Sequence, residues 1–285
     1  MAKTYNDLYI STRKKLREAG IAAHSLEARL LVACAAGKTV EKLLRDMMLY
    51  TSDETEQKLL TMLERRLKGE PVAYITGEWE FYGLPILVDR NVLIPRTDTE
   101  LLVDLAIRAV RGKKMDARVL DLCCGSGCIG CAIAHELPAS RVVMADISHD
   151  ALAICRKNVQ RNHLTPRVTC IEADALQPPP MLVGNFDLLI CNPPYIPSAD
   201  IRTLDSSVRD YEPVGALDGG DDGLVFYRSI LKNWKSALRH GGLLLFEVGI
   251  GQAEDVRTQM IMSGFLGVEC VKDTSGIDRV VMGRI

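Results

Sequence analysis

The tetrapeptide Asn192-Pro193-Pro194-Tyr195 has residue types that suggest chemistry. It follows the apolar run 186–191, which is typical of a buried strand, and open α/β sheets bind ligands at the carboxyl ends of their strands. The two prolines stiffen the backbone and remove two N–H donors. The Asn192 side-chain oxygen and the Pro193 carbonyl oxygen are therefore acceptors for a ligand rich in N–H donors.

This acceptor pair suits a planar amide or conjugated amine nitrogen, whose lone pair is delocalised and weakly nucleophilic. Two hydrogen bonds would position that nitrogen, and Tyr195 would stack on the planar group or face a cation. Alignment of the nitrogen with an electrophilic methyl group can supply about 7 to 11 kcal/mol in favourable cases. We predict catalytic roles for Asn192, Pro193 and Tyr195, with Pro194 joining them in substrate binding. A proline-stiffened turn without chemistry is the alternative.

A glycine-rich segment forms the second candidate site. The run 119–121 leads into Cys123-Cys124-Gly125-Ser126-Gly127 and then a helical pattern, an arrangement in which a ligand approaches the backbone closely. Gly125-x-Gly127-x-x-Gly130 also fits the dinucleotide fingerprint. Asp146 lies at the end of the next predicted strand, where a carboxylate binds ribose hydroxyls. Together these features indicate an adenosine cofactor.

Asp121 favours one class of adenosine cofactor. A carboxylate at the strand tip would repel a pyrophosphate, as in a nicotinamide cofactor, but would attract an ammonium group. S-adenosylmethionine carries an ammonium and a sulfonium, and we predict it as the cofactor. Asp174 would accept from the adenine amino group, although turn capping is the alternative for both aspartates. The predicted cofactor-binding residues are Asp121, Cys123, Cys124, Gly125, Ser126, Gly127, Asp146, Asp174, Ala175 and Asn192.

Four of the nine cysteines cluster near the glycine-rich segment, at positions 123, 124, 128 and 131. A structural metal site needs four ligands, and no histidine or second cysteine pair completes this set. We therefore predict no metal. Most other cysteines lie in apolar runs, where we expect reduced thiols that act as small hydrophobic side chains.

The rest of the pattern indicates two domains joined by a hairpin. Residues 1–72 show helical periods only, as in Leu26, Leu30 and Ala33, and are predicted to form a small all-helical N-terminal domain. From Tyr74, including Ile75, short aromatic and β-branched runs broken by glycine and proline predict a β-hairpin linker over 73–95.

Residues 96–285 are predicted to form an α/β domain. Thr97-Asp98-Thr99-Glu100 fits a capping box that begins a long helix. Continuous apolar strands separated by helical patterns predict a doubly wound, mostly parallel sheet, and the closely spaced last run, 279–282, predicts a final antiparallel strand. The predicted parallel strands are 118–122, 141–145, 167–171, 186–191 and 243–248.

The composition excludes several classes of partner. The 285 residues carry a formal charge of −2, so there is no overall basic field, and we expect no stable nucleic-acid partner. The N-terminus has no apolar leader and no apolar stretch is long enough to span a bilayer. We therefore expect a cytoplasmic protein with no membrane partner.

Several segments beyond the motifs identify a family. The sequence resembles the peptide-chain release factor glutamine N5-methyltransferases in residues 71–78, 93–96, 192–195 and 216–220 and in the Asp121 loop. The resemblance implies a seven-stranded methyltransferase sheet, a helical domain that helps to recognise the release factor, and transfer of a methyl group to the glutamine of its Gly-Gly-Gln motif. Asn192 would then hold the glutamine amide, residues 123–127 the methionine part of the cofactor, and Asp146 its ribose.

Three positions depart from the family pattern. Cys123 replaces a usual glycine and is expected to have an ordinary φ, Thr97 replaces a frequent proline, and Ala175 replaces a bulkier side chain beside adenine. Arg96 is predicted on the substrate side, with a surface salt bridge as the alternative.

Three other functions remain open at this stage. One is an N-methyltransferase acting on an exocyclic amine of DNA or ribosomal RNA, which would use the same acceptor pair on a flipped base. Another is a module that binds the cofactor without catalysis, because a fold alone does not prove activity. The third is an NAD-linked enzyme, which would bind nicotinamide; we expect no such binding.

Overall fold

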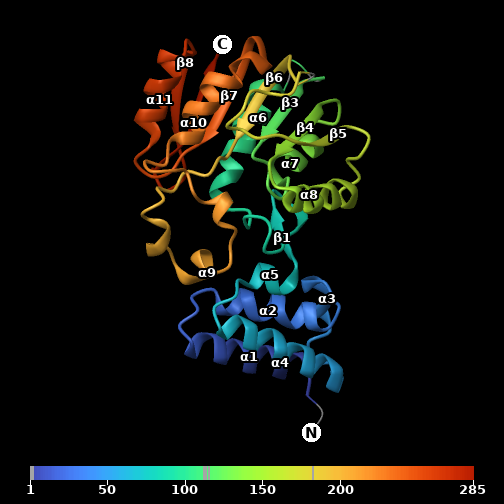
Figure 1. Cartoon of the computed structure of the whole chain (residues 1–285). Coiled ribbons are helices and arrows are strands. Elements are labelled where there is room, and N and C mark those ends of the chain that lie inside the picture. The colour runs from blue at the N-terminus through green and yellow to red at the C-terminus, as the bar shows by residue number, and fades with distance from the viewer. Residues whose placement is uncertain (1–2, 112–113, 115, 182) are drawn as a thin grey trace. The chain divides into compact units, whose positions relative to one another are not determined.

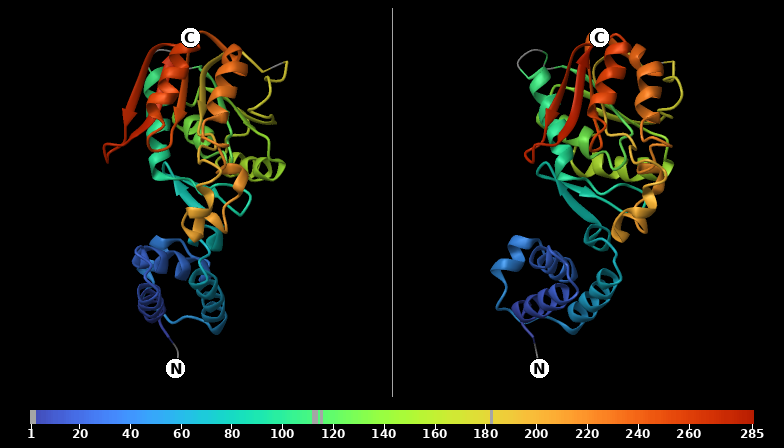
Figure 2. Two further views of the ribbon diagram at one scale, coloured as in Figure 1. Left: turned by 60° about the vertical axis from the view of Figure 1, so that its left-hand side comes forward. Right: turned by 90° about the vertical axis from the view of Figure 1, so that its left-hand side faces the viewer.

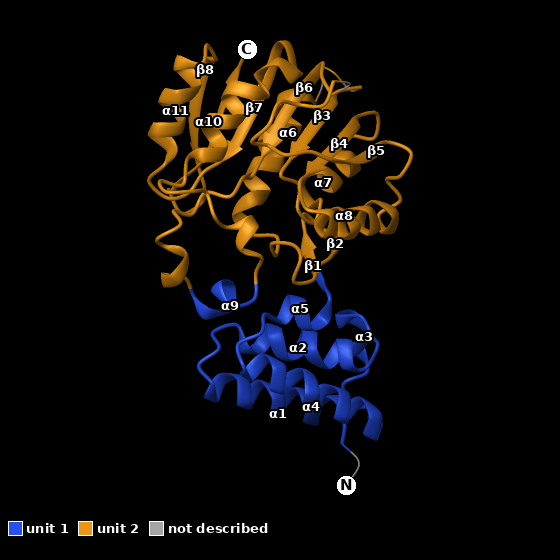
Figure 3. Cartoon of the chain, viewed as in Figure 1, with its two compact units in different colours: residues 1–78, 205–211 blue, residues 79–204, 212–285 orange. Residues whose placement is uncertain are grey.

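The computed structural model describes residues 3–111, 114, 116–181 and 183–285, which fall into two compact units (Figure 3). The helical unit holds the chain up to Glu78 together with Asp205–Tyr211. The sheet unit holds Trp79–Leu204 and Glu212–Ile285. Among the described residues, no helix is long and apolar enough to cross a membrane.

The helical unit confirms the predicted all-helical N-terminal region. Thr4 and Ser52 cap two of its helices, each with a side-chain oxygen that accepts from a backbone N–H in the first turn. Leu31 and Leu63 are buried in its core. Leu26, which was predicted on the buried face of its helix, is 49% exposed, so the buried face is shifted from the predicted one. The helices are α1 (Tyr5–Glu18), α2 (His24–Ala35), α3 (Val40–Arg45), α4 (Asp53–Leu67), α5 (Val72–Thr76) and α9 (Ser206–Arg209) (Figure 1).

A β-hairpin forms as predicted, but it begins later than expected. It consists of β1 (Glu78–Phe81) and β2 (Leu84–Leu87). Tyr74 and Ile75, predicted in the hairpin, are buried in the short helix α5, which Gly77 ends at a φ of +76°. The prediction was wrong there because a short apolar run does not distinguish a buried helical turn from a strand.

The sheet unit contains a seven-stranded sheet in the order β5-β4-β3-β6-β7-β9-β8. The first five of these strands pair in parallel, whereas β9 is antiparallel to both neighbours, which confirms the predicted fold class. The strands are β3 (Arg118–Leu122), β4 (Arg141–Asp146), β5 (Val168–Glu172), β6 (Phe186–Cys191), β7 (Leu238–Glu247), β8 (Leu266–Lys272) and β9 (Asp278–Arg284).

Helices cover both faces of this sheet, as Figure 2 shows. On one face α6 contacts α7 and α7 contacts α8, whereas α10 contacts α11 on the other. The predicted capping box before α6 does not form: residues Thr97–Thr99 make a 3-10 turn, and Glu100 accepts from the Tyr82 N–H instead. These helices are α6 (Glu100–Val110), α7 (Cys128–Glu136), α8 (His149–Arg161), α10 (Val225–Asn233) and α11 (Ala253–Met262).

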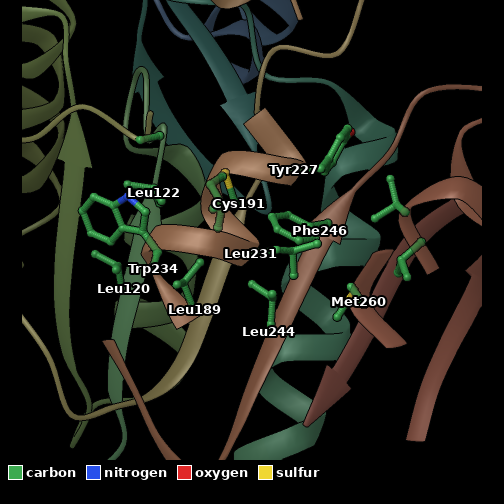
Figure 4. Packing of buried hydrophobic residues seen from close by; sticks show 14 of the residues in the cluster. Leu120, Leu122, Leu189, Cys191, Tyr227, Leu231, Trp234, Leu244, Phe246 and Met260 are labelled. Carbon is green, nitrogen blue, oxygen red and sulfur yellow. The ribbon is translucent and has the colours of Figure 1, made fainter. Parts of the chain in front are cut away.

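Large apolar side chains fill the space between the sheet and α10 (Figure 4). Trp234 is fully buried, and the rings of Tyr227 and Phe246 meet edge to face at 5.2 Å between centroids. Such packing holds the strands rigidly, so their carboxyl ends have fixed positions.

Asn158 on α8 connects three segments of the sheet unit. It is fully buried, accepts from the Leu87 N–H at 2.7 Å, and donates to the Leu87 and Ser126 carbonyl oxygens at 3.0 and 2.9 Å. The hairpin, α8 and the glycine-rich segment therefore share one side chain.

We predict that Asn158→Ala lowers the free energy of unfolding by about 2 to 3 kcal/mol, because it leaves a buried N–H without a partner. Urea denaturation measures this change. Asn162→Ala is the matched control: its partly exposed side chain also bonds the hairpin, through Pro85, and should cost less than half as much. Equal losses in the two variants would contradict the assignment.

Candidate active site

A cavity of about 440 Å³ lies at the carboxyl ends of the parallel strands, a size typical of small-molecule sites. The sheet order reverses here, because β3 has β4 on one side and β6 on the other. Leu122 and Cys191 are register partners, so the glycine-rich loop and Asn192 begin from adjacent positions. The predicted site residues that line the cavity are Arg96, Cys123, Cys124, Gly125, Ser126, Asp146, Asp174, Ala175, Asn192 and Pro194.

The glycine-rich loop turns through three residues with positive φ. Gly125 and Gly127 have φ values of +52° and +78°, and a Cβ on Gly127 would lie 2.7 Å from the Cys155 sulfur. Cys123 has a φ of +60°, so the expected ordinary φ is wrong. A residue other than glycine in this left-handed conformation is destabilised by roughly 1 to 2 kcal/mol. The backbone at Cys123 nevertheless has the conformation that glycine adopts readily.

Asp121 does not line the cavity, although it was predicted to bind the cofactor. It is fully buried, and its Oδ2 accepts from the Gly130 N–H of α7 at 2.9 Å. Its Oδ1 is buried without a hydrogen-bond partner among the residues that the structure describes. Burial raises the pKa of this carboxyl to about 7, and the Gly130 hydrogen bond opposes that rise.

Asp146 ends β4 and lines the cavity as predicted. Its Oδ2 accepts from the Gly125 N–H at 2.8 Å and its Oδ1 from the Ser148 N–H at 2.9 Å. Burial raises its pKa, whereas these N–H groups lower it. Each carboxylate oxygen has a further lone pair, so hydroxyl groups of a ligand can still bind.

Asp174 and Ala175 lie after β5 and also line the cavity. Asp174 Oδ1 accepts from the Leu176 N–H at 2.8 Å, which is the turn-capping contact that the sequence left as an alternative. Its Oδ2 makes no such hydrogen bond to any described residue and the side chain is half-buried, so a donor in the cavity can reach a carboxylate oxygen. Ala175 is buried and leaves room beside it.

Asn192 follows β6 and contacts Thr99, the residue directly before α6. Its Nδ2 donates to the Thr99 hydroxyl at 3.4 Å. Pro194 lines the cavity beside it, whereas Pro193 is buried outside the lining. The acceptor side of the Asn192 amide is thereby available to the cavity.

Tyr195 is not brought into the cavity lining. Its ring packs against the hydrophobic core, and its carbonyl oxygen accepts from Gln252 Nε2 at 2.8 Å. Burial and the nearby Glu247 raise the pKa of its hydroxyl to about 12. The observed contacts are those of a residue that anchors the tetrapeptide, not of one that stacks on a ligand.

A second segment packs on the tetrapeptide from outside. Ile196 exchanges backbone hydrogen bonds with it: the Leu217 carbonyl accepts at 3.0 Å and the Gly219 N–H donates at 2.8 Å. A Cβ on Gly223 would lie 2.3 Å from the Tyr195 carbonyl oxygen. Only glycine permits this close approach, which accounts for the glycine-rich run that begins at Gly219.

Arg96 lines the cavity and pairs with Glu212. The Glu212 side chain is 1% exposed and also accepts from the Ile94 N–H at 3.3 Å. Arg96 therefore forms a salt bridge, which was the alternative prediction for this residue. Its partner is buried, so the salt bridge fixes Arg96 beside the cavity. Sequence reasoning missed Glu212, because nothing in its local pattern marks it as a partner of a residue so distant in the chain.

No group of three His, Cys, Asp or Glu side chains in the described part of the chain is arranged to hold a metal ion. Cys128 and Cys131 are buried free thiols at the start of α7. Burial raises the pKa of Cys128 to about 12, so it remains a protonated, apolar side chain.

Comparisons with known proteins agree with this geometry. Residues 7–77 match the family model described as the PrmC N-terminal domain, and residues 98–205 match that of the methyltransferase small domain. The catalytic domain of hMettl16, solved with an RNA hairpin, has a TM-score of 0.58 at 16% identity and covers 83% of this chain and 84% of that one, which shows the fold alone.

Curated relatives extend the match over nearly the whole chain. The release factor glutamine methyltransferase of Geobacter sulfurreducens is 42% identical, covering 96% of this chain and 94% of the relative. That of Agrobacterium fabrum is 37% identical, covering 96% of this chain and 95% of the relative. This chain therefore belongs to the release factor glutamine methyltransferase family.

Proposed function

We propose that this protein transfers a methyl group from S-adenosylmethionine to the side-chain nitrogen N5 of the glutamine in the Gly-Gly-Gln motif of peptide-chain release factors. The observation that carries the proposal is the pairing of Leu122 with Cys191, which starts the glycine-rich loop and Asn192 at neighbouring points on one cavity. Family membership supports the substrate. We further propose that the helical unit takes part in recognising the release factor, and that the reaction takes place in the cytoplasm.

The cavity residues fit this cofactor. Asp146 offers free lone pairs to ribose hydroxyls, residues 123–126 would line the methionine part with Gly127 outside the lining, and Ala175 leaves space for adenine next to Asp174. Asp121 Oδ1 is buried and has no hydrogen-bond partner among the described residues. The ionised carboxylate would attract a cation near the loop electrostatically, although the side chain does not reach the cavity. When bound, the cofactor supplies an electrophilic methyl group on a sulfonium.

The protein's own part in the reaction is orientation. Asn192 Oδ1, in the cavity lining, accepts one N–H bond of the glutamine amide; the Pro193 carbonyl oxygen accepts the other, although Pro193 itself is outside the lining, and the pair directs the nitrogen toward the methyl group. Tyr195 holds these two acceptors in place through its partly buried ring and through the hydrogen bond that its carbonyl oxygen accepts from Gln252. No base is needed before transfer, because the methylated nitrogen is positively charged and acidic. Once the methyl–sulfur bond has broken and S-adenosylhomocysteine remains as the second product, that nitrogen loses its proton to water.

The direct test is mass spectrometry of purified release factor after incubation with this protein and S-adenosylmethionine. We expect one added methyl group on the glutamine of the Gly-Gly-Gln motif. DNA and ribosomal RNA are incubated in parallel with labelled cofactor. Label found only in nucleic acid would replace the proposed substrate with an exocyclic amine, and no label anywhere would favour a non-catalytic module.

Asn192→Ala removes one of the two acceptors and should lower kcat by about 10²- to 10³-fold, the usual effect of losing one hydrogen bond that orients the reacting group. Affinity for S-adenosylhomocysteine, measured by calorimetry, should stay nearly unchanged. Asn162→Ala, at the end of α8 and outside the cavity lining, is the control and should retain full activity. Undiminished kcat in Asn192→Ala would remove the orientation mechanism.

Asp146→Ala should weaken binding of S-adenosylhomocysteine by about 10- to 100-fold, because it removes charged hydrogen bonds to the ligand and the contact that holds Gly125. Isothermal titration calorimetry measures the Kd. Asp150→Ala removes an exposed acid from the first turn of α8 and should bind as the unaltered protein does. If both variants bind equally well, Asp146 does not hold the ribose.

A further inference from the structure

Glu247 is a buried acid that the mechanism above does not use. It ends β7 and is 2% exposed, and its Oε2 has no hydrogen-bond partner among the described residues. Burying a carboxylate is costly without an ion-pair partner, so a fold that keeps one usually has a functional reason. Sequence analysis did not select this residue.

The sheet places Glu247 beside Asn192. Cys191 on β6 and Phe246 on β7 are parallel register partners, so Asn192 and Glu247 are the next residues on two adjacent strands. Thr99, which is 2% exposed, accepts from Asn192 Nδ2 and also lowers the pKa of Glu247. Three residues from separate segments thus form one polar group, in which Thr99 and Glu247 are buried and Asn192 is half-buried.

One hydrogen of the Asn192 amide has a partner among the described residues, and a second acceptor lies next to it. Nδ2 donates to the Thr99 hydroxyl at 3.4 Å, and the Glu247 carboxylate, which follows the neighbouring strand position and has an unpartnered Oε2, is the acceptor available to the other hydrogen. An ionised carboxylate only accepts, so it selects the NH₂ side of the amide. In the flipped orientation, the Asn192 oxygen would face the Glu247 carboxylate, and the two acceptors would repel each other.

The surroundings keep Glu247 free for this contact. Arg279 on β9 is the nearest source of positive charge acting on it, but the guanidinium pairs with Asp98 and Asp273 at 3.2 and 3.3 Å. Burial raises the pKa of Glu247 to about 7, whereas Thr99, Arg279 and Asn192 lower it and Asp98 raises it. The carboxylate therefore has no ion pair of its own within the described chain, which leaves its oxygens available to the Asn192 amide.

We propose that Glu247, together with Thr99, is a positioning residue that fixes the Asn192 amide with its oxygen directed at the glutamine nitrogen of the substrate. This inference rests on the proposed function, because it assigns a task to Asn192 Oδ1 in methyl transfer. Glu247 acts through Asn192 and touches neither substrate nor cofactor.

The first test compares Glu247→Leu with Glu247→Gln. Leucine cannot accept a hydrogen bond, so kcat should fall by about 10- to 100-fold, as is common when a residue that orients a reacting group is lost. Glutamine keeps one acceptor oxygen and should lose less than about 10-fold on the same reasoning. The Kd for S-adenosylhomocysteine should not change in either variant.

Thermal unfolding separates positioning from a structural role. Replacing an unpaired buried charge by an apolar side chain leaves stability unchanged or higher, so Glu247→Leu should retain its Tm while losing activity. Glu269→Leu, an exposed glutamate on β8, is the matched control and should keep both. A fall in Tm that accounts for the lost activity would overturn the proposal.

A reversed pair gives the sharpest test. Asn192→Asp alone places two carboxylates side by side and should be nearly inactive. Adding Glu247→Gln supplies an NH₂ donor that bonds one new carboxylate oxygen and leaves the other for the substrate, so kcat should recover at least about 10-fold. A double variant no more active than Asn192→Asp would overturn the positioning role.

The two proposals fail in distinguishable ways. If the unaltered protein methylates no release factor, the proposed function is wrong. If it methylates the glutamine, but Glu247→Leu keeps full kcat, only the role of Glu247 is wrong.

Discussion

The site depends on the parallel pairing of β3 with β6. Because Leu122 and Cys191 share a register position, the chain leaves both strands at the same level, once into the glycine-rich loop and once into the tetrapeptide. A shift of one residue would turn every side chain of a strand to the opposite face. On β6 the buried Asp187 accepts from the Arg118 N–H of β3 at 2.7 Å, and a shift would remove this carboxylate from its donor, so this contact helps to set the spacing between the two halves of the cavity.

Much of the fold could be predicted from periodicity. Continuous apolar runs such as 118–122 and 186–191 mark buried parallel strands, and residues that end or follow such strands line the cavity, as Asp146, Cys123 and Asn192 do. This success has a simple physical basis: a parallel sheet gathers its carboxyl ends at one edge, so position relative to a strand end is enough to locate a site.

Side-chain direction was harder to predict. Asp121 and Tyr195 adjoin the two motifs, yet each is directed into the protein, Asp121 toward Gly130 and Tyr195 toward the core. Strand alternation defines two faces but does not say which of them a ligand occupies. Glu212 and Glu247 could not be found at all, because Arg96, the ion-pair partner of Glu212, and Asn192, the strand neighbour of Glu247, are distant in the sequence and only the tertiary fold brings them together.

The glycine-rich loop is held from three directions by groups of the protein itself. Asn158 bonds the Ser126 carbonyl, Asp146 bonds the Gly125 N–H, and Asp121 bonds the Gly130 N–H that follows. The loop therefore loses its conformational entropy when the chain folds, not when a ligand arrives. Ligand binding should accordingly be governed by solvent displacement and direct contacts, with little contribution from ordering of the loop backbone. The backbone amides of the loop should exchange their hydrogens with solvent only when a larger part of the domain opens.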